Sequence, residues 1–177
     1  MALLTLSLGS NQRADYHLRR ALDGLTEHFG PLYMSSVFES QAVGFQGSNF
    51  LNMVVAVETE QPLEQIAAWL KALEAANGRE HTEKRFSSRT LDVDILTWGT
   101  ACGRCAGILL PRPEITENAY VLWPMSEVCG TCVDPHSGLS YTRLWAAYDK
   151  SRQALWPIDF EWRGQQISSA VAYRIAH

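Results

Sequence analysis

The stretch Leu91-Asp92-Val93-Asp94-Ile95-Leu96-Thr97-Trp98 decides the fold class of this chain. Apolar and acidic residues alternate over its first half, which is the period of a strand with one buried face, so a strand is predicted at 91–98. A polar segment precedes it, and before that lies the most regular helical pattern of the sequence. Pro62 suits the first turn of that helix and Asn77-Gly78 suit its end. The chain therefore contains a helix followed by a strand over residues 62–98.

The residues before this pair repeat the same two kinds of element. A strand is predicted at 3–8, a helix at 18–29, and two further strands at 32–39 and 50–59. The full order is the βαββαβ order of ferredoxin-like folds, so we predict an α+β protein with an antiparallel sheet and both helices on one face. Beyond residue 100 one more helix is expected, near 139–148. Residues 1–148 are predicted to form the domain and residues 149–177 a C-terminal appendage.

Composition and charge narrow the class of protein. The 177 residues, 46% hydrophobic and 19% charged, suit one soluble domain of ordinary size. A formal net charge of −4 disfavours a globally basic nucleic-acid binder. No apolar run has the length of a membrane helix, and the first residues lack the basic start of a signal peptide. A cytoplasmic protein with no membrane and no nucleic-acid partner is expected.

Asp92 and Asp94 are the strongest candidates for chemistry. Because they are two residues apart on a strand, both carboxylates project from the same face, while Leu91, Val93 and Ile95 point to the other. Two neighbouring carboxylates repel each other, and a hard cation such as Mg²⁺ between them removes that conflict. The alternative is a pair of solvated acids on an exposed strand face.

The polar segment 78–89 favours the chemical interpretation. It carries four permanent cations just before the carboxylate pair: Arg79, Lys84, Arg85 and Arg89. Phosphoryl transfer uses metal-bound carboxylates to hold phosphate oxygens and arginines to neutralise charge in the transition state. A loosely paired, charged surface loop is the alternative. The common glycine-rich nucleotide-binding loops do not occur in the sequence.

All four cysteines lie in two Cys-x-x-Cys pairs, Cys102 with Cys105 and Cys129 with Cys132. Each pair contains a glycine, and four thiolates satisfy a tetrahedral Zn²⁺ ion. We therefore predict a structural zinc site that clamps the segment after strand 91–98 onto the domain. Two disulfides, a redox pair and an iron–sulfur cluster are the alternatives.

Several short motifs, in order from about residue 3 to residue 145, resemble those of one enzyme family, the 6-hydroxymethyl-7,8-dihydropterin pyrophosphokinases of folate biosynthesis. The most diagnostic is Arg89-Thr90-Leu91-Asp92-Val93-Asp94-Ile95-Leu96. The others are Ser7-Leu8-Gly9-Ser10-Asn11, Ser35-Ser36-Val37-Phe38-Glu39-Ser40 with Val43-Gly44, Phe50-Leu51-Asn52, Glu74 with Gly78-Arg79, and Leu110-Pro111-Arg112-Pro113 with Tyr120-Val121-Leu122-Trp123-Pro124.

The resemblance implies an activity and a set of site residues. Family members share the ferredoxin-like core and transfer the pyrophosphoryl group of ATP to the pterin hydroxymethyl oxygen, releasing AMP. The implied catalytic residues are Arg79, Arg89, Asp92 and Asp94, with the two aspartates holding two Mg²⁺ ions. The implied pterin site comprises Ser40, Val43, Phe50, Asn52 and Tyr120, in which the two aromatic rings sandwich the pterin. The implied ATP site comprises Lys71, Glu74, Arg85, Phe86, Ile95 and Arg112.

The sequence also departs from the family pattern. Arg112 stands where the family usually has histidine, Asn118 where arginine is common, and Gln41 where proline is common. Arg112 can still contact a phosphate, as a permanent cation. None of these positions is among the two aspartates and two arginines of the core mechanism. A relative that acts on a different pterin, and a non-catalytic nucleotide- or RNA-binding module, are the alternatives; the oligomeric state stays open.

Overall fold

A six-stranded antiparallel sheet forms the centre of the structure, a computed structural model that describes residues 1–42, 47–78 and 90–171. Its strands lie in the order β5-β1-β4-β3-β8, and the short β2 also pairs with β4. The bounds are β1 Ala2–Ser10, β2 Tyr33–Met34, β3 Phe38–Ser40, β4 Phe50–Thr59, β5 Asp92–Trp98 and β8 Leu155–Pro157. The strands predicted at 3–8, 50–59 and 91–98 are confirmed as β1, β4 and β5.

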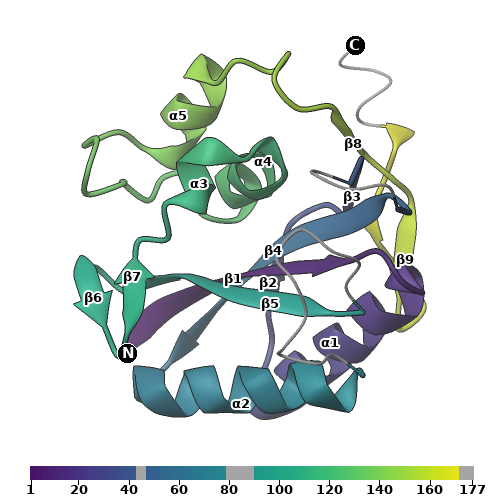
Figure 1. Ribbon diagram of the computed structural model, residues 1–177, viewed down its shortest axis with the longest axis horizontal. Coiled ribbons are helices and arrows are strands. Elements are labelled where there is room, and N and C mark those ends of the chain that lie inside the picture. The colour runs from purple at the N-terminus through teal and green to yellow at the C-terminus, as the bar shows by residue number, and fades with distance from the viewer. Residues whose placement is uncertain (43–46, 79–89, 172–177) are drawn as a thin grey trace.

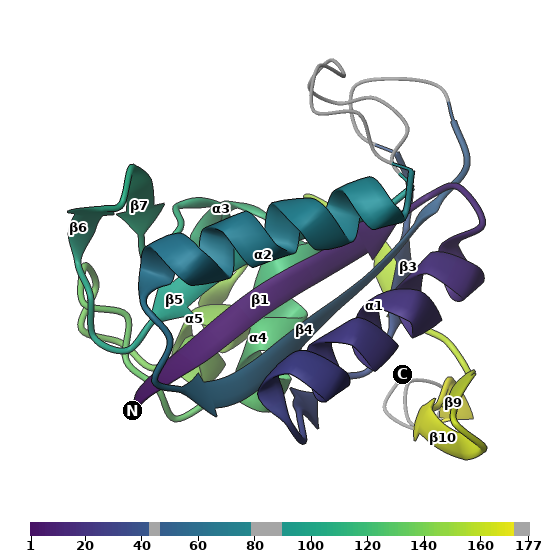
Figure 2. The same ribbon diagram turned by 90° about the horizontal axis from the view of Figure 1, so that it is seen from below.

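Helices cover both faces of this sheet (Figure 1). On one face lie the two long helices α1, Ala14–Phe29, and α2, Leu63–Ala76, side by side across the strands (Figure 2). The ferredoxin-like arrangement, with both of these helices on one face, is confirmed. On the opposite face lie α3, Glu114–Glu117, α4, Ala119–Val128, and α5, Tyr141–Ala147. Among the described helices, none is long and apolar enough to cross a membrane.

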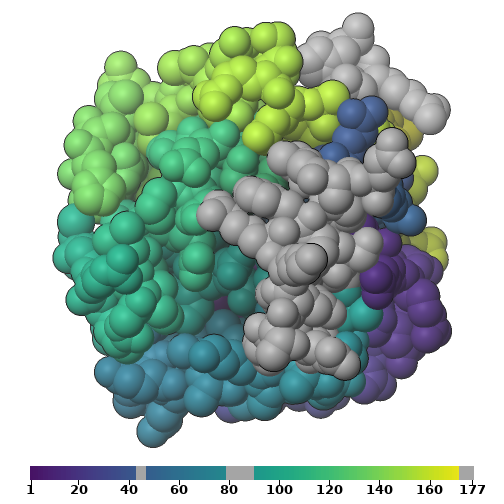
Figure 3. Space-filling model, viewed as in Figure 1, coloured from purple at the N-terminus to yellow at the C-terminus, as the bar shows by residue number. Residues whose placement is uncertain are grey.

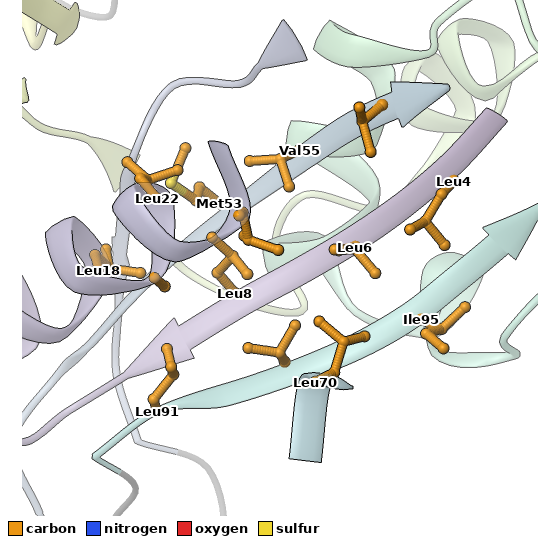
Figure 4. Close-up of a cluster of buried hydrophobic side chains, with 14 of the residues drawn as sticks. Leu4, Leu6, Leu8, Leu18, Leu22, Met53, Val55, Leu70, Leu91 and Ile95 are labelled. Atoms are coloured by element: carbon orange, nitrogen blue, oxygen red, sulfur yellow. The ribbon is translucent and has the colours of Figure 1, made fainter. Parts of the chain in front are cut away.

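The main hydrophobic core lies between the sheet and the two long helices (Figure 4). Leu4, Leu6 and Leu8 alternate along β1 toward this side and are at most 1% exposed. They pack with Leu22 of α1 and Leu70 of α2. Full burial of a leucine contributes about 1.5–3 kcal/mol, so this one strand anchors both helices. A second cluster, including Val54, Leu96, Leu122, Met125 and Tyr141, holds α4 and α5 to the other face.

The strand predicted at 32–39 is interrupted, and forms β2 and β3 separately. At the break, the backbone N–H of Ser35 donates to the Val54 carbonyl, and the Val54 N–H donates to Ser35 Oγ. Each of these two hydrogen bonds is 2.9 Å long. Val37 turns instead to the C-terminal part of the chain. Its N–H donates to Ser168 Oγ at 2.9 Å, and its carbonyl accepts from the Ile158 N–H at 2.9 Å. Side-chain hydroxyls and a distant segment thus replace the regular ladder here.

Residues 149–171 are integrated into the fold. β8 pairs with β3 in the main sheet, and the hairpin of β9, Phe160–Trp162, and β10, Gln165–Ser168, contacts α1. Trp162 Nε1 donates to Asp23 Oδ1 at 3.1 Å, and Arg163 Nε donates to the same oxygen at 2.8 Å. Arg19 Nε of α1 donates to the Glu161 carbonyl at 2.8 Å. The predicted appendage therefore supplies a strand to the sheet as well as a surface hairpin.

Tyr141, which is 2% exposed in the second cluster, provides a pH-dependent test of this packing. Burial, with a smaller contribution from Asp134, raises the pKa of Tyr141 from 10.0 to about 12. Because the folded state disfavours the phenolate, the stability that Tyr141 contributes is fully present below its unfolded pKa and is lost as pH rises toward about 12. We expect Tyr141→Phe to flatten the fall in the free energy of unfolding across that window.

Urea denaturation of the wild-type and variant proteins at several alkaline pH values measures this slope. Tyr33→Phe is the matched control because Tyr33 is 67% exposed. An equal slope for Tyr141→Phe and Tyr33→Phe would contradict the prediction.

Candidate active site

Strand register brings three of the predicted site residues, Asn52, Asp92 and Asp94, onto the face of the sheet that α4 covers. Gly9 of β1 pairs with Asn52 of β4 on one side and with Asp92 of β5 on the other. Directly paired residues of antiparallel strands project from the same face. Asn52, Gly9 and Asp92 therefore form one row, with the backbones of its two ends about 10 Å apart. Asp94, two residues beyond Asp92, lies on the same face.

Gly9 leaves the middle of this row open. A Cβ atom there would lie 3.5 Å from Asn52 Oδ1 and 4.0 Å from Phe50 Cδ1, and would meet no other described atom within 4 Å. These are ordinary van der Waals distances, so the strand itself could carry a side chain at this position. Without one, the backbone between the amide of Asn52 and the carboxylate of Asp92 is exposed to a flat ligand.

Asn52 is held in place by its neighbour on β3. It is 6% exposed, and its Nδ2 donates to Ser40 Oγ at 2.8 Å. Ser40 pairs with Phe50, so Ser40, Phe50 and Asn52 share the face described above. A buried asparagine amide needs several hydrogen-bonding partners, and a ligand over Gly9 would meet its oxygen.

Tyr120, on the first turn of α4, is close enough to Asp92 and Asp94 for their charges to affect its pKa. It packs against the second cluster and against the smaller cluster of Phe38, Ala119 and Leu155. Burial raises the pKa of Tyr120, and the negative charges of Asp92 and Asp94 raise it further, with smaller contributions from Glu114 and Tyr148. The phenol is therefore neutral at physiological pH, and it lies near the two carboxylates.

Arg112 lies beside the carboxylate pair. Its Nη2 atom is 3.9 Å from Asp94 Oδ1, and its Nε donates to the Ile95 carbonyl at 3.0 Å. The Arg112 N–H donates to the Leu96 carbonyl at 2.9 Å, so both main chain and side chain tie this residue to β5. The result is a fixed positive charge at the edge of the site.

The donor set of Asp92 and Asp94 suits Mg²⁺. Both are partly exposed carboxylates on one strand face, and Mg²⁺ characteristically takes one or two protein carboxylates and completes its shell with water and phosphate oxygens. Within the described ranges, no cluster of three or more histidine, cysteine, aspartate or glutamate side chains could hold a metal by itself. An ion at this pair would complete its shell with water or with phosphate oxygens of a bound substrate.

Two residues predicted on the ATP side have structural contacts in the fold. Glu74 of α2 is 6% exposed, and its Oε2 accepts from the Val93 N–H at 3.0 Å, which holds β5 from the helix side. Ile95 is 3% exposed and belongs to the main core. Its side chain lies on the face of β5 opposite Asp92 and Asp94, so the predicted contribution of Ile95 to the ATP site would come from its main chain. Lys71 is exposed on α2.

Five predicted site residues lie outside the described ranges. They are Val43, Arg79, Arg85, Phe86 and Arg89. Conversely, sequence reasoning assigned no role to Gly9. The signal was present in the motif Ser7-Leu8-Gly9-Ser10-Asn11, but its meaning depends on which residues flank it in the sheet.

The structure corrects the prediction of a zinc site. Cys129 and Cys132 form a disulfide, while Cys102 and Cys105 are thiols. Cys105, on the hairpin of β6, Gly103–Cys105, and β7, Ile108–Leu110, packs against the main core, whereas Cys129 belongs to the cluster beneath α4. The two pairs thus pack in different clusters. Disulfide sulfurs cannot act as the thiolate ligands that zinc requires.

The fold and this site define a class: a ferredoxin-like protein with two carboxylates and an arginine on one sheet face, an arrangement suited to phosphoryl transfer. Comparison with known proteins identifies the family within that class. The chain belongs to the 7,8-dihydro-6-hydroxymethylpterin-pyrophosphokinase (HPPK) family, whose family model matches residues 5–130.

Individual relatives agree with this assignment. The chain is similar to the 2-amino-4-hydroxy-6-hydroxymethyldihydropteridine pyrophosphokinase of Aquifex aeolicus, at 30% identity over 138 residues, which cover 76% of this chain and 85% of the relative. The Bacillus subtilis enzyme of the same name is 32% identical over 129 residues, covering 70% and 76% of the two chains. Among solved structures, wild-type Plasmodium falciparum HPPK-DHPS matches with a TM-score of 0.67 at 11% identity, covering 94% of this chain. This chain spans 50% of that longer one. Because the identity is only 11%, the match shows the fold alone.

Proposed function

We propose that this protein transfers the pyrophosphoryl group of ATP to the hydroxymethyl oxygen of 6-hydroxymethyl-7,8-dihydropterin, releasing AMP, as a step of folate biosynthesis. The observation that carries the proposal is the row Asn52, Gly9 and Asp92. In this row the Asn52 amide, which can hydrogen-bond the edge of a heterocycle, lies on one side of Gly9, which has no side chain. The carboxylate pair lies on the other side, on the same sheet face. We take residues 1–148 as the catalytic domain.

The pterin ring lies over Gly9, between the rings of Phe50 and Tyr120. Stacking on an aromatic face is worth about 1–3 kcal/mol for a nucleobase, and a pterin is a comparable flat heteroaromatic. Asn52 hydrogen-bonds the amide edge of the ring, and its orientation is supported by the 2.8 Å bond to Ser40. Val43 is proposed to line the same pocket.

The triphosphate of ATP lies toward Asp92 and Asp94, which we propose hold two Mg²⁺ ions. Bound Mg²⁺ would neutralise phosphate charge and polarise the hydroxymethyl group. The guanidinium of Arg112, 3.9 Å from Asp94, supplies a further positive charge for a phosphate oxygen. Arg79 and Arg89 are proposed to stabilise the transferring group, and Arg85 and Phe86 to contact ATP. Lys71 is proposed on the nucleotide side, while Glu74 acts by holding β5 through the Val93 amide.

The reaction is a direct displacement at the β-phosphorus. The hydroxymethyl oxygen forms a new bond to that phosphorus, and the bond from the β-phosphorus to the oxygen shared with the α-phosphate breaks. AMP leaves with that oxygen, and the hydroxyl proton is lost to solvent. The row of site residues supports this geometry because it puts the pterin edge and the phosphate side at neighbouring positions on one face.

Chromatography of nucleotide products from Mg-ATP, with and without 6-hydroxymethyl-7,8-dihydropterin, tests the proposal. We expect AMP that depends on the pterin, no ADP, and loss of AMP formation on adding excess EDTA. Other hydroxymethyl pterins serve as competing acceptors in the same assay. ADP as the product would refute pyrophosphoryl transfer. Nucleotide binding without turnover and without a response to Mg²⁺ would instead support a non-catalytic binding module.

A further inference from the structure

The segment that follows α5, residues 148–157, connects the two walls of the proposed pterin pocket. One wall is α4 with Tyr120, and the other is formed by β3 and β4 with Ser40 and Asn52. In the space-filling view the yellow-green surface of this segment runs along the top of the molecule, directly above the green surface of α4 (Figure 3). The matched family model ends at residue 130, so this segment lies beyond it. Gln153 contacts α4, and Leu155 contacts β3. The inference below rests on the proposed function.

Gln153 replaces the usual cap at the start of α4. Asn118 occupies the N-cap position, where an asparagine side chain normally accepts from a backbone N–H of the first turn, but it makes no such bond. Gln153 Oε1 instead accepts from the Ala119 N–H at 2.8 Å. Gln153 Nε2 donates to Asn118 Oδ1 at 3.0 Å, which also explains why Asn118 is not available as a cap.

Leu155 attaches the same segment to the opposite wall. It pairs with Ser40 of β3 and is 9% exposed in a cluster with Phe38 and Ala119. The next residue, Trp156, donates from Nε1 to Glu39 Oε2 at 2.9 Å. Two residues along the chain from Gln153, the segment is therefore bonded to the strand that orients Asn52.

We propose that Gln153 is a positioning residue for pterin binding: it caps α4 at the residue before Tyr120 and, through Leu155, fixes that ring relative to Ser40 and Asn52. Without the cap, the Ala119 amide loses its partner and the first turn of α4 can fray. Tyr120 is on that turn. The pterin would then contact a fixed wall at Asn52 and Ser40 and a mobile one at Tyr120.

Gln153→Met tests the proposal, because methionine has nearly the same length but neither hydrogen-bonding atom. We expect the KM for 6-hydroxymethyl-7,8-dihydropterin to rise about tenfold, the KM for Mg-ATP to change less than about twofold, and kcat to fall less than about threefold. Gln153→Glu should restore the wild-type pterin KM, since its carboxylate accepts from Ala119 and the Asn118 amide can rotate to donate to it. Gln165→Met, at an exposed glutamine of β10, is the matched control.

Equilibrium binding of the fluorescent compound 6-hydroxymethylpterin provides a second readout that needs no turnover. A pterin KM and dissociation constant within about twofold of wild type in Gln153→Met would overturn the inference. Should that variant not fold, Asn118→Ala removes one of the two bonds and should raise the same two constants by a smaller factor. A wild-type protein that binds the pterin but forms no AMP would refute the proposed reaction, and the dissociation constants would still decide the role of Gln153. Failure of the wild type to bind the pterin would refute both.

Discussion

Asp94→Ala is expected to lower kcat for AMP formation by about 10³-fold or more, equivalent to about 4 kcal/mol of transition-state stabilisation. Asp94 projects from the same strand face as Asp92 and lies 3.9 Å from Arg112. Removing it leaves a single carboxylate and takes away the acid 3.9 Å from Arg112, so the phosphate side of the site loses half of its proposed metal ligands. Asp94→Asn, which keeps the shape of the side chain and removes the charge, should have a similar effect.

The fold should survive this change. The Asp94 side chain is 40% exposed, and Val93 and Ile95, the residues of β5 in the main core, point to the opposite face. We expect a thermal midpoint within a few degrees of wild type. Glu58→Ala, which removes an exposed carboxylate from β4, is the matched control for loss of one negative charge from the sheet. Near-normal turnover of Asp94→Ala in Mg-ATP would sink the two-metal assignment.

Gly9→Val is expected to reduce kcat/KM for the pterin by about 10²-fold or more while leaving nucleotide binding intact. Among the described atoms, a Cβ at this position meets those of Asn52 and Phe50, at 3.5 and 4.0 Å, and valine is well suited to a strand. The two methyl groups would project from the floor of the proposed pocket into the place of the pterin ring. The substitution is therefore expected to weaken pterin binding and to leave the stability of the fold unchanged.

A graded pair of variants makes this prediction specific. Gly9→Ala adds only the Cβ, which stays at van der Waals distance, and should cost less than about tenfold. Steady-state kinetics with the pterin varied, and equilibrium binding of Mg-ATP, separate the two substrates. An unchanged pterin KM in Gly9→Val would show that the ring does not lie over Gly9.

Local periodicity was sufficient to predict the elements that form the main core. The alternation around Asp92 and Asp94 predicted both β5 and the common face of the two carboxylates, because a period of two is a local property. Helix α4 was not predicted. Its sequence, Ala119–Val128, is apolar on nearly all sides and contains Pro124, so it shows no single stripe. It packs against the sheet on one side and α5 on another, which explains that composition.

Features that depend on contacts between residues far apart in the sequence could not be predicted from local periodicity. The row through Gly9 requires the register of three strands. The strands β8, β9 and β10 have three or four residues each, too few for periodicity to distinguish them from loops. The cysteine spacing suggested one metal site, but spacing does not say whether two pairs meet, and in the fold they pack in different clusters.

The two outer strands of the sheet have a consequence for self-association. An open strand edge offers unpaired N–H and C=O groups to another chain and promotes aggregation. Here β8 is only three residues long and ends in Pro157, which has no N–H to offer a new strand. At the other border, Arg112 already bonds the carbonyls of Ile95 and Leu96 on β5. The guanidinium that we place beside the phosphates therefore also covers the Ile95 carbonyl at a sheet edge, so replacing it would affect solubility as well as turnover.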